Sequence, residues 1–418
     1  MGSIKEEGKT GPGTQKLAMK SKAKIKTRTF FNIGTQRALY DKVGGYVNKE
    51  FYIQEYIKIL KERHHLDRIY RFDLGQNNDG CTEEIEERFK ELSQTNIRQY
   101  IKNYPEFICL ELRKKIANLH NIFPEWIQLS AGLEQMLTNI ASSFLEFNDR
   151  VMVTSPTFYL FEEFSKRMGA VPIYLRLREE DNFAWTSSTF DEYRKILNRL
   201  NPKLIWIADP NNPTGMSISR EMLENIIREA GDHYSFVVMD EAYGEYTDND
   251  NEVRSASSLL EKYNNLIVLR TFSKAYGLAN LRVGYAMCAN NDIMSALKIH
   301  RAYFPITQFS FDFAGIALDQ TGFLKAVRQK AAKRKKYFVE KVQKLNHIVY
   351  MNSETNIIMI RHQKLSANKL MDFLAEHGII VAKVPSEEEE VILQRYIRVT
   401  LGTRSELDYF LNVLEKSA

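Results

Sequence analysis

One segment indicates the architecture most clearly: Leu204-Ile205-Trp206-Ile207-Ala208-Asp209-Pro210-Asn211-Asn212-Pro213-Thr214-Gly215. Its first five residues are apolar, which is typical of a strand covered by helices on both faces. The Asn-Pro-Thr-Gly at its end is a sequence that favours a turn. Short apolar runs of the same kind recur after Pro124 and predict further strands over Val151–Ser155, Ile173–Leu177, Phe236–Met239, Leu266–Leu269 and Val283–Cys288.

Amphipathic stretches lie between these runs, for example Phe190–Leu200 and Ser219–Ala230. Strands that alternate with helices predict βα units, a mainly parallel sheet and therefore the α/β fold class. In such sheets ligands bind beyond the carboxyl ends of the strands. We therefore expect the functional groups just after each apolar run.

The chain is expected to fall into four segments. Residues 1–29 carry eight basic and two acidic groups, and their low apolar content predicts a disordered basic tail. Residues 30–100 are expected to form an N-terminal arm with a helix, whose apolar stripe packs either on the chain itself or on a neighbouring subunit. Residues 101–305 are expected to form a large domain and residues 306–418 a smaller α+β domain. The elements predicted in the smaller domain are Leu324–Leu345, Asn356–Arg361, Ser366–His377, Ile379–Lys383, Tyr396–Thr400 and a helix from Ser405.

Composition excludes several classes of protein. The 418 residues are 44% apolar, with 58 Lys and Arg against 53 Asp and Glu, which is ordinary for globular proteins. No apolar run is long enough for a membrane span, and no secretory signal is predicted. Cys81, Cys109 and Cys288 form neither a disulfide framework nor a zinc spacing, so we expect no metal site and a reducing, cytoplasmic location.

Polar groups follow four of the strands or lie within them. They are Asn212 after the first run, Asp240-Glu241-Ala242-Tyr243, Thr271-Phe272-Ser273-Lys274 followed by Arg282, and Arg398 in the strand Tyr396–Thr400. Each has an ordinary explanation as a turn residue, a helix cap, a solvated lysine or an edge-strand charge. Together they bring an amine, a carboxylate, a phenol, an amide, hydroxyls and two guanidinium groups to one edge of one sheet.

This ordered set resembles the class I/II aminotransferases of pyridoxal-phosphate fold type I, and the histidinol-phosphate aminotransferase group is the nearest. The resemblance runs from about Asn103 to Thr403. It implies a large, cofactor-binding domain with a three-layer α/β/α arrangement, a smaller α+β domain, pyridoxal 5'-phosphate as cofactor, and a homodimer with shared active sites.

The resemblance also implies roles for the residues at the sheet edge. Lys274 would form the Schiff base with the cofactor and then carry the proton between the substrate α-carbon and the cofactor. Asp240 would pair with the pyridine nitrogen, which makes the ring an electron sink. Tyr243 and Asn212 would hydrogen-bond the phenolic oxygen of the ring.

A second group of residues would bind the cofactor phosphate. The backbone N–H groups of Leu133 and Glu134 are expected at the start of a helix over Gln135–Phe144, where anions are favoured. Thr271, Ser273 and Arg282 would complete this site. By resemblance, Tyr104 would reach the phosphate in the neighbouring subunit. Phe158 stands where the family stacks an aromatic ring on the cofactor, although core packing explains it equally well.

The substrate side differs from the family pattern. Arg398 would bind the α-carboxylate through its planar guanidinium and so draw the two domains together. Asn212, Gly75 and Asn77 are also expected near the substrate. However, Leu74–Gly80 stands where the histidinol-phosphate group carries Asn-Glu-Asn-Pro, and the Glu and Pro are missing. Histidinol phosphate is therefore only a weak prediction.

Three functions remain open from the sequence. The leading one is an aminotransferase that moves an amino group between an amino acid, or an amine like it, and a 2-oxo acid. The second is a decarboxylase, lyase or oxidase that uses the same cofactor on an amino acid, because one fold hosts all of these reactions. The third is a non-catalytic regulatory protein that binds nucleic acid through its basic tail, which the complete set of cofactor residues disfavours. No membrane partner is expected.

Overall fold

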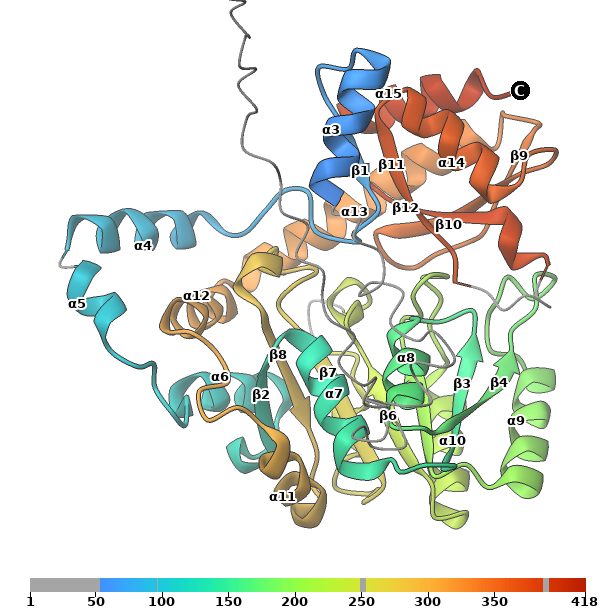
Figure 1. Cartoon of the computed structure of the whole chain (residues 1–418). Coiled ribbons are helices and arrows are strands. Elements are labelled where there is room, and N and C mark those ends of the chain that lie inside the picture. Colours follow the sequence, from blue (N-terminus) through green and yellow to red (C-terminus); the bar gives the residue numbers. More distant parts are fainter. Residues whose placement is uncertain (1–52, 96, 249–252, 386–390) are drawn as a thin grey trace, which may run out of the picture.

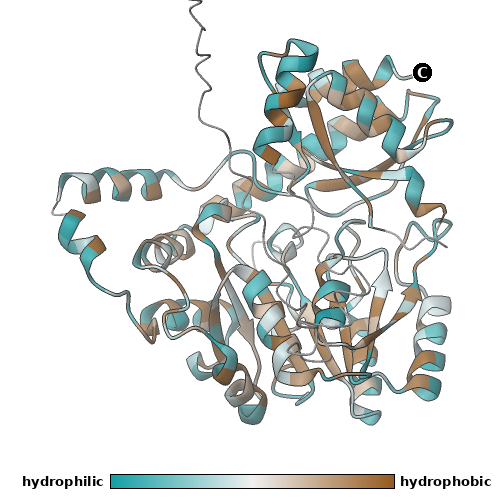
Figure 2. Ribbon diagram, viewed as in Figure 1, coloured by the Kyte–Doolittle hydropathy of each residue, from teal (hydrophilic) through white to brown (hydrophobic). Residues whose placement is uncertain are grey.

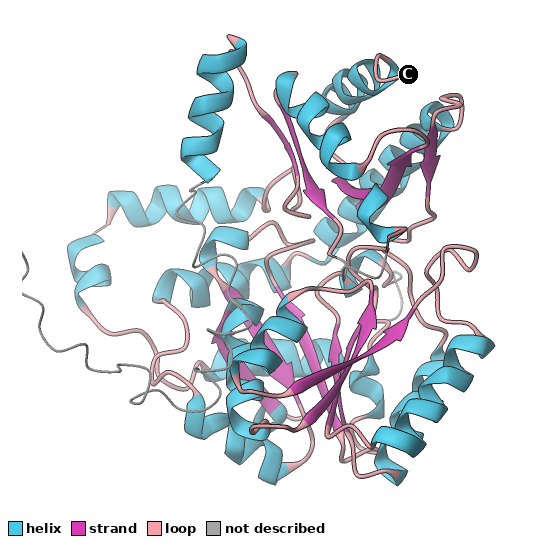
Figure 3. Ribbon diagram, turned by 45° about the vertical axis from the view of Figure 1, so that its right-hand side comes forward, coloured by secondary structure: helices cyan, strands magenta, loops and turns pink. Residues whose placement is uncertain are grey.

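The six apolar runs form neighbouring strands of one large sheet in the computed structural model of the chain (Figure 1). The structure describes residues 53–95, 97–248, 253–385 and 391–418. The basic tail predicted over residues 1–29 lies outside the described residues. A second, smaller sheet lies above the first in Figure 1, and Figure 3 shows both sheets with their helices from another side.

The large sheet has seven strands in the order β2-β8-β7-β6-β5-β3-β4. Only β8 runs opposite to the direction of the other six strands, so the prediction of a mainly parallel sheet is confirmed. Strand β2 was not predicted as a strand, because Gln128 and Ser130 interrupt its apolar run although both are buried. The strands are β2 (Ile127–Ala131), β3 (Arg150–Ser155), β4 (Val171–Arg176), β5 (Leu204–Ala208), β6 (Phe236–Asp240), β7 (Leu266–Thr271) and β8 (Val283–Met287).

Helices cover both faces of this sheet and complete the predicted three layers. One face is covered by α7 (Gly132–Phe144), α8 (Leu160–Arg167) and α11 (Asn291–His300). The other face is covered by α6 (Leu110–His120), α9 (Ser187–Leu200), α10 (Arg220–Asp232) and α12 (Gln308–Asp319). Helix α10 shows the local cause: Ser219 caps its first turn, and its apolar residues recur every three or four positions and are buried.

The smaller sheet is mixed and has five strands in the order β1-β11-β12-β10-β9. The predicted helices and strands of this region are present, with ends shifted by a few residues. Apolar strand residues pack against the helices and appear brown in Figure 2, whereas the outer helix faces are teal. The elements are β1 (Tyr70–Phe72), β9 (Ile348–Tyr350), β10 (Ile357–His362), β11 (Ile379–Lys383), β12 (Tyr396–Thr400), α13 (Thr321–Val342), α14 (Ala367–Glu376) and α15 (Arg404–Glu415).

The N-terminal region joins this smaller sheet. Strand β1 pairs in parallel with β11, although some 300 residues of sequence separate them. Helix α3 (Ile53–His64) packs on the same unit, because its buried Leu60 contacts Ala375 and Ile380. The apolar stripe predicted for this helix therefore packs on the chain itself.

Helices α4 (Glu83–Gln94) and α5 (Ile97–Lys102) extend away from the body at the left of Figure 1. Among the described residues, no helix is long and apolar enough to cross a membrane. Short 3₁₀ helices connect the remaining elements: Pro124–Trp126, Gly244–Tyr246, Ala256–Leu259, Ala279–Leu281 and Leu393–Arg395.

Candidate active site

A cavity of about 240 Å³ lies at the carboxyl ends of β5, β6 and β7, beside the start of α7. This is where a parallel sheet is expected to bind a ligand. The structure brings most of the predicted cofactor residues to this one cavity. Its lining includes Leu133, Glu134, Phe158, Asn212, Asp240, Tyr243, Thr271, Ser273, Lys274 and Arg282.

Asp240 places a buried acid in the cavity wall. It is the last residue of β6 and only 4% exposed, and its carboxylate accepts a hydrogen bond from the Ala242 N–H at 2.9 Å. Burial raises the pKa of Asp240 to about 6, while the Ala242 N–H and the charge of Lys274 oppose that rise. A buried carboxylate of this kind is stabilised by a cationic or N–H partner in the cavity.

Gly75 allows the backbone to approach Tyr243 and Lys274. Its φ of +68° favours glycine, and a Cβ atom there would lie 2.0 Å from the Tyr243 hydroxyl and 3.4 Å from the Lys274 amine. The Lys274 amine donates to the Leu74 carbonyl at 2.8 Å and lies 5.3 Å from the centre of the Tyr243 ring. The Tyr243 hydroxyl is buried and has no hydrogen-bond partner in the described part of the chain.

The other end of the cavity has the chemistry of an anion site. Helix α7 starts at Gly132 with φ +74°, and a Cβ atom there would lie 2.2 Å from a terminal nitrogen of Arg282. The Arg282 guanidinium also donates to the Ser273 hydroxyl at 3.4 Å, and the Thr271 hydroxyl donates to Ser273 at 3.0 Å. A guanidinium, two hydroxyls and a helix N-terminus together favour a phosphate.

Strand β12 carries Arg398 toward the large domain. Side chains alternate along a strand, so Ile397 and Val399 are buried in the small core while Arg398 and Thr400 lie on the opposite face. Arg398 donates to the Asn212 side-chain oxygen at 2.6 Å and to the Asp73 carbonyl. The Thr400 hydroxyl accepts from the Gly75 N–H at 2.8 Å. The buried Nε of Arg398 has no hydrogen-bond partner among the residues that the structure describes.

Two predicted residues lie elsewhere. Tyr104 is 83% exposed, so it does not line the cavity of its own chain, and it stacks on Phe304 at 4.8 Å. The Asn77 amide donates to the Ala275 and Gly80 carbonyls at 3.0 and 3.2 Å, which holds the 73–80 loop against the segment that carries Lys274.

Sequence reasoning missed five residues that line the cavity: Tyr159, Leu160, Ala208, Pro210 and Ala242. Ala208, Pro210 and Ala242 adjoin predicted residues at strand ends, so the strand-end rule points to them. Tyr159 and Leu160 come from the start of α8, for which the sequence carries no such signal. Asn211 holds the segment that precedes Phe158 in place. Its side chain accepts a hydrogen bond from the Thr157 hydroxyl and donates one to the Pro156 carbonyl, both at 2.9 Å.

Comparison with known proteins identifies the family. The family described as aminotransferase class I and II matches residues 69–414. The chain belongs to the class I and II aminotransferases. A histidinol-phosphate aminotransferase from Thermoanaerobacter pseudethanolicus is 31% identical over 369 residues, which cover 87% of this chain and 98% of that one.

Solved structures share the fold of this aminotransferase. The histidinol-phosphate aminotransferase from Sinorhizobium meliloti, in complex with pyridoxal-5'-phosphate, matches with a TM-score of 0.75 and 20% identity over 90% of this chain and 98% of that one. The L-threonine-O-3-phosphate decarboxylase from Porphyromonas gingivalis matches with a TM-score of 0.68 and 21% identity, over 84% of this chain and 99% of that one. The predicted fold type I and class I/II aminotransferase family are confirmed.

The cavity fits the cofactor of this family, pyridoxal phosphate. The buried Asp240, Tyr243 and Lys274 line it together with the anion site at Arg282, and the Tyr243 hydroxyl has no partner among the described residues. The aminotransferase is therefore a pyridoxal-phosphate enzyme, and the bound cofactor supplies an electron sink for the negative charge formed at the substrate α-carbon.

Proposed function

We propose that this aminotransferase moves an amino group between an amino acid and a 2-oxo acid, with Lys274 as the amine that holds the cofactor and carries the proton. One observation carries the proposal: the Lys274 amine, the Asp240 carboxylate and the Tyr243 hydroxyl face one cavity that ends in an anion site at Arg282. These groups also serve the decarboxylase, lyase and oxidase reactions of the same fold, so product analysis separates the alternatives.

Each predicted residue of the cavity has a role in this proposal. The N–H groups of Leu133 and Glu134 hold the phosphate with Thr271, Ser273 and Arg282. Asp240 pairs with the pyridine nitrogen, and Phe158 covers a face of the ring. Tyr243 and Asn212 bind the phenolic oxygen, for which the free hydroxyl of Tyr243 is available. The Leu74 carbonyl, 2.8 Å from the Lys274 amine, orients that amine whenever it is free.

Arg398 binds the substrate carboxylate in this proposal. Its cross-strand neighbours are Met359 on β10 and Ala382 on β11, so neither side supplies a second cation. A single guanidinium matches one planar carboxylate. This favours an ordinary amino acid as donor, while the named relatives make histidinol phosphate the second substrate class to assay.

The proposed dimer forms through an aromatic patch. Tyr104, Phe107, Tyr303 and Phe304 contact one another, and their exposed fractions are 83, 40, 78 and 40%. Exposed aromatic clusters of this kind mark interfaces between proteins. The patch brings Tyr104 to the partner's cavity, so each site would be shared between subunits.

A cytoplasmic location stays a prediction, supported by the absence of a disulfide among Cys81, Cys109 and Cys288.

The test measures the products formed from a panel of amino donors and histidinol phosphate with 2-oxo acids. We expect an amino acid to yield its 2-oxo acid with no CO₂ or peroxide; release of either would assign the decarboxylase or oxidase alternative.

Because Lys cannot form a two-point contact with a carboxylate, Arg398→Lys is expected to raise KM for the amino-acid donor about tenfold. The control Arg404→Lys lies on α15, where the side chain is 65% exposed, and is expected to match the wild type.

A further inference from the structure

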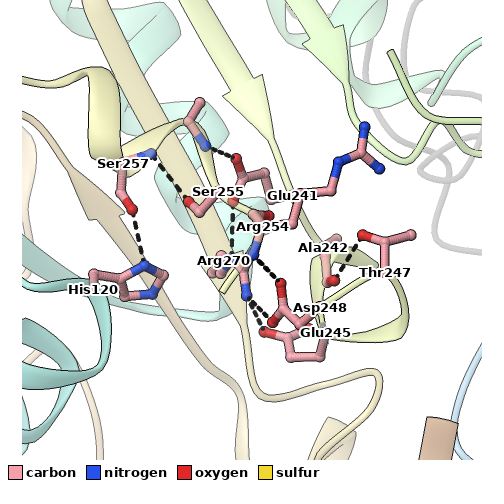
Figure 4. Close-up of polar contacts among 12 residues, drawn as sticks. His120, Glu241, Ala242, Glu245, Thr247, Asp248, Arg254, Ser255, Ser257 and Arg270 are labelled. Atoms are coloured by element: carbon pink, nitrogen blue, oxygen red, sulfur yellow. Dashed lines mark hydrogen bonds and ion pairs between the residues drawn. The ribbon is translucent and has the colours of Figure 1, made fainter. Parts of the chain in front are cut away.

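A buried cluster of charges surrounds the Arg270 side chain (Figure 4). Successive residues of a strand point to opposite faces. Asp240 and Thr271 line the cavity, so the adjacent Glu241 and Arg270 point away from it. Arg270 is fully buried, and the side chain of Glu241 is only 2% exposed.

Arg270 joins the two strand ends to the turn that follows β6. Its Nε donates to the Glu241 carboxylate at 2.9 Å, and its terminal nitrogens donate to both Asp248 oxygens at 3.0 and 3.3 Å. It also donates to the Arg254 carbonyl at 2.9 Å and to Glu245 at 3.5 Å. Figure 4 shows these groups converging on one guanidinium.

The turn that holds Tyr243 is built around this guanidinium. Gly244 directly follows Tyr243, and a Cβ atom on Gly244 would lie 2.7 Å from a terminal nitrogen of Arg270 and 2.8 Å from its central carbon. Only a residue without a side chain lets the backbone of the turn lie on the guanidinium. The position of Tyr243 therefore depends on Arg270.

We propose that Arg270 is a positioning residue: through Glu241 and the backbone of Gly244 it sets where the Asp240 carboxylate and the Tyr243 hydroxyl stand around the Lys274 amine. None of these contacts belongs to the cavity, so Arg270 acts without touching cofactor or substrate. This inference rests on the proposed roles of Asp240, Tyr243 and Lys274.

The charges of the cluster support this role. Burial contributes most to the raised pKa of Asp240, and the negative charge of Glu241 raises it further. Arg270 neutralises Glu241 and so limits this further rise in the pKa of Asp240, which must stay ionised. Burial raises the pKa of Glu245, and the charge of Arg270 opposes that rise. Burial and the charge of Arg270 lower the pKa of His120, so His120 adds no second cation.

The test compares Arg270→Lys and Glu241→Gln with Arg194→Lys as matched control. Arg194 makes a two-point contact with Glu229, at 2.7 and 2.8 Å, between α9 and α10 and away from the cavity. Three quantities are measured: the Kd of the cofactor-free protein for pyridoxal phosphate, the pH midpoint of the visible absorbance of the bound cofactor, and kcat and KM per bound cofactor.

Because small displacements of reacting groups are costly, we expect Arg270→Lys to weaken pyridoxal-phosphate binding and to lower kcat, each about tenfold, with KM nearly unchanged. Removing the charge in Glu241→Gln is expected to lower the absorbance midpoint by about half a pH unit. The Arg194→Lys control should match the wild type in all three.

The proposal is overturned if both variants keep the wild-type Kd for pyridoxal phosphate and the wild-type pH midpoint of the absorbance. Such a result, even with a lower melting temperature, would show that Arg270 and Glu241 have a purely structural role. If Arg270→Lys does not fold, Glu241→Gln decides alone, because its amide keeps the shape of the carboxylate. Failure of the wild type itself to bind pyridoxal phosphate would instead refute the roles proposed for the cavity residues.

Discussion

Several polar atoms in this aminotransferase are buried without the partners that burial normally demands. Among the described residues, the Tyr243 hydroxyl and the Nε of Arg398 have no hydrogen-bond partner, and Asp240 has one N–H and no direct ion pair. Unpaired polar groups in the interior cost stability. The site is thus arranged to be completed by its ligands.

Asp240 gives a prediction on stability and pH. Its pKa in the folded chain, about 6, is above the ordinary 3.8. The folded state therefore holds the proton more tightly than the unfolded state, and stability falls as pH rises from about 4 to about 6. Because the penalty is fully present at pH 7.5, Asp240→Asn should stabilise the cofactor-free protein there by up to about 3 kcal/mol.

Thermal unfolding of the cofactor-free protein at pH 4.5 and 7.5 measures this effect. The gain in stability of Asp240→Asn should be smaller at pH 4.5. The control Asp232→Asn, on the exposed end of α10, should show no gain in stability. An Asp240→Asn protein that is less stable than the wild type at pH 7.5 would contradict the assignment.

At the scale of single elements, the start of α7 combines a glycine, a guanidinium and the N–H groups of a first helical turn. The contact between Gly132 and Arg282 leaves no space for a side chain, and φ +74° adds strain for any other residue. Gly132→Ala should therefore displace Arg282 and weaken pyridoxal-phosphate binding at least about tenfold by loss of phosphate contacts.

Titration of the cofactor-free variant with pyridoxal phosphate checks this expectation. Gly322→Ala is a suitable control, because a Cβ atom there meets no atom within 4 Å. Since pyridoxal lacks the phosphate, its binding should change much less in Gly132→Ala. An equal loss for pyridoxal and pyridoxal phosphate would show that the phosphate site is not what the substitution damages.

The elements also show what sequence patterns predict and what they miss. Strands covered on both faces appear as unbroken apolar runs, and those runs were found. The run Phe236–Met239 was predicted to end one residue early, because Asp240 continues the ladder with Leu269 although it is an acid. Strand β1 was missed because its partner β11 is remote in sequence, and periodicity carries no information on pairing.

The grouping of strand-end residues in one cavity was predicted better than the smaller strands, for a physical reason. Lys274, Asp240 and Asn212 each follow an apolar run, and parallel strands bring their carboxyl ends to one edge. Contacts between remote segments, such as Gly75 with Tyr243 or Arg270 with Asp248, leave no periodic signal in the sequence. Such contacts appear only in three dimensions.

At the scale of the whole molecule, the exposed aromatic patch predicts a dimer. Tyr303 is 78% exposed within the patch, whereas Tyr234 is 92% exposed at the end of α10. Burying a charge in an apolar interface is costly, so Tyr303→Glu should weaken the dimer at least about tenfold and lower activity with it. Tyr234→Glu should leave both unchanged. Sedimentation and activity as functions of concentration measure the effect; a fully active monomer would contradict the shared site.

The central claim is that Lys274 is the amine to which the cofactor is bonded. Borohydride treatment of the holoenzyme fixes the cofactor on the amine that holds it, and mass spectrometry of the digested protein locates the added group. We expect the modification on the peptide that contains Lys274 and none in Lys274→Ala, which should also lose turnover and visible absorbance while keeping its fold. Modification of any other lysine, or an unchanged spectrum in Lys274→Ala, would contradict the account.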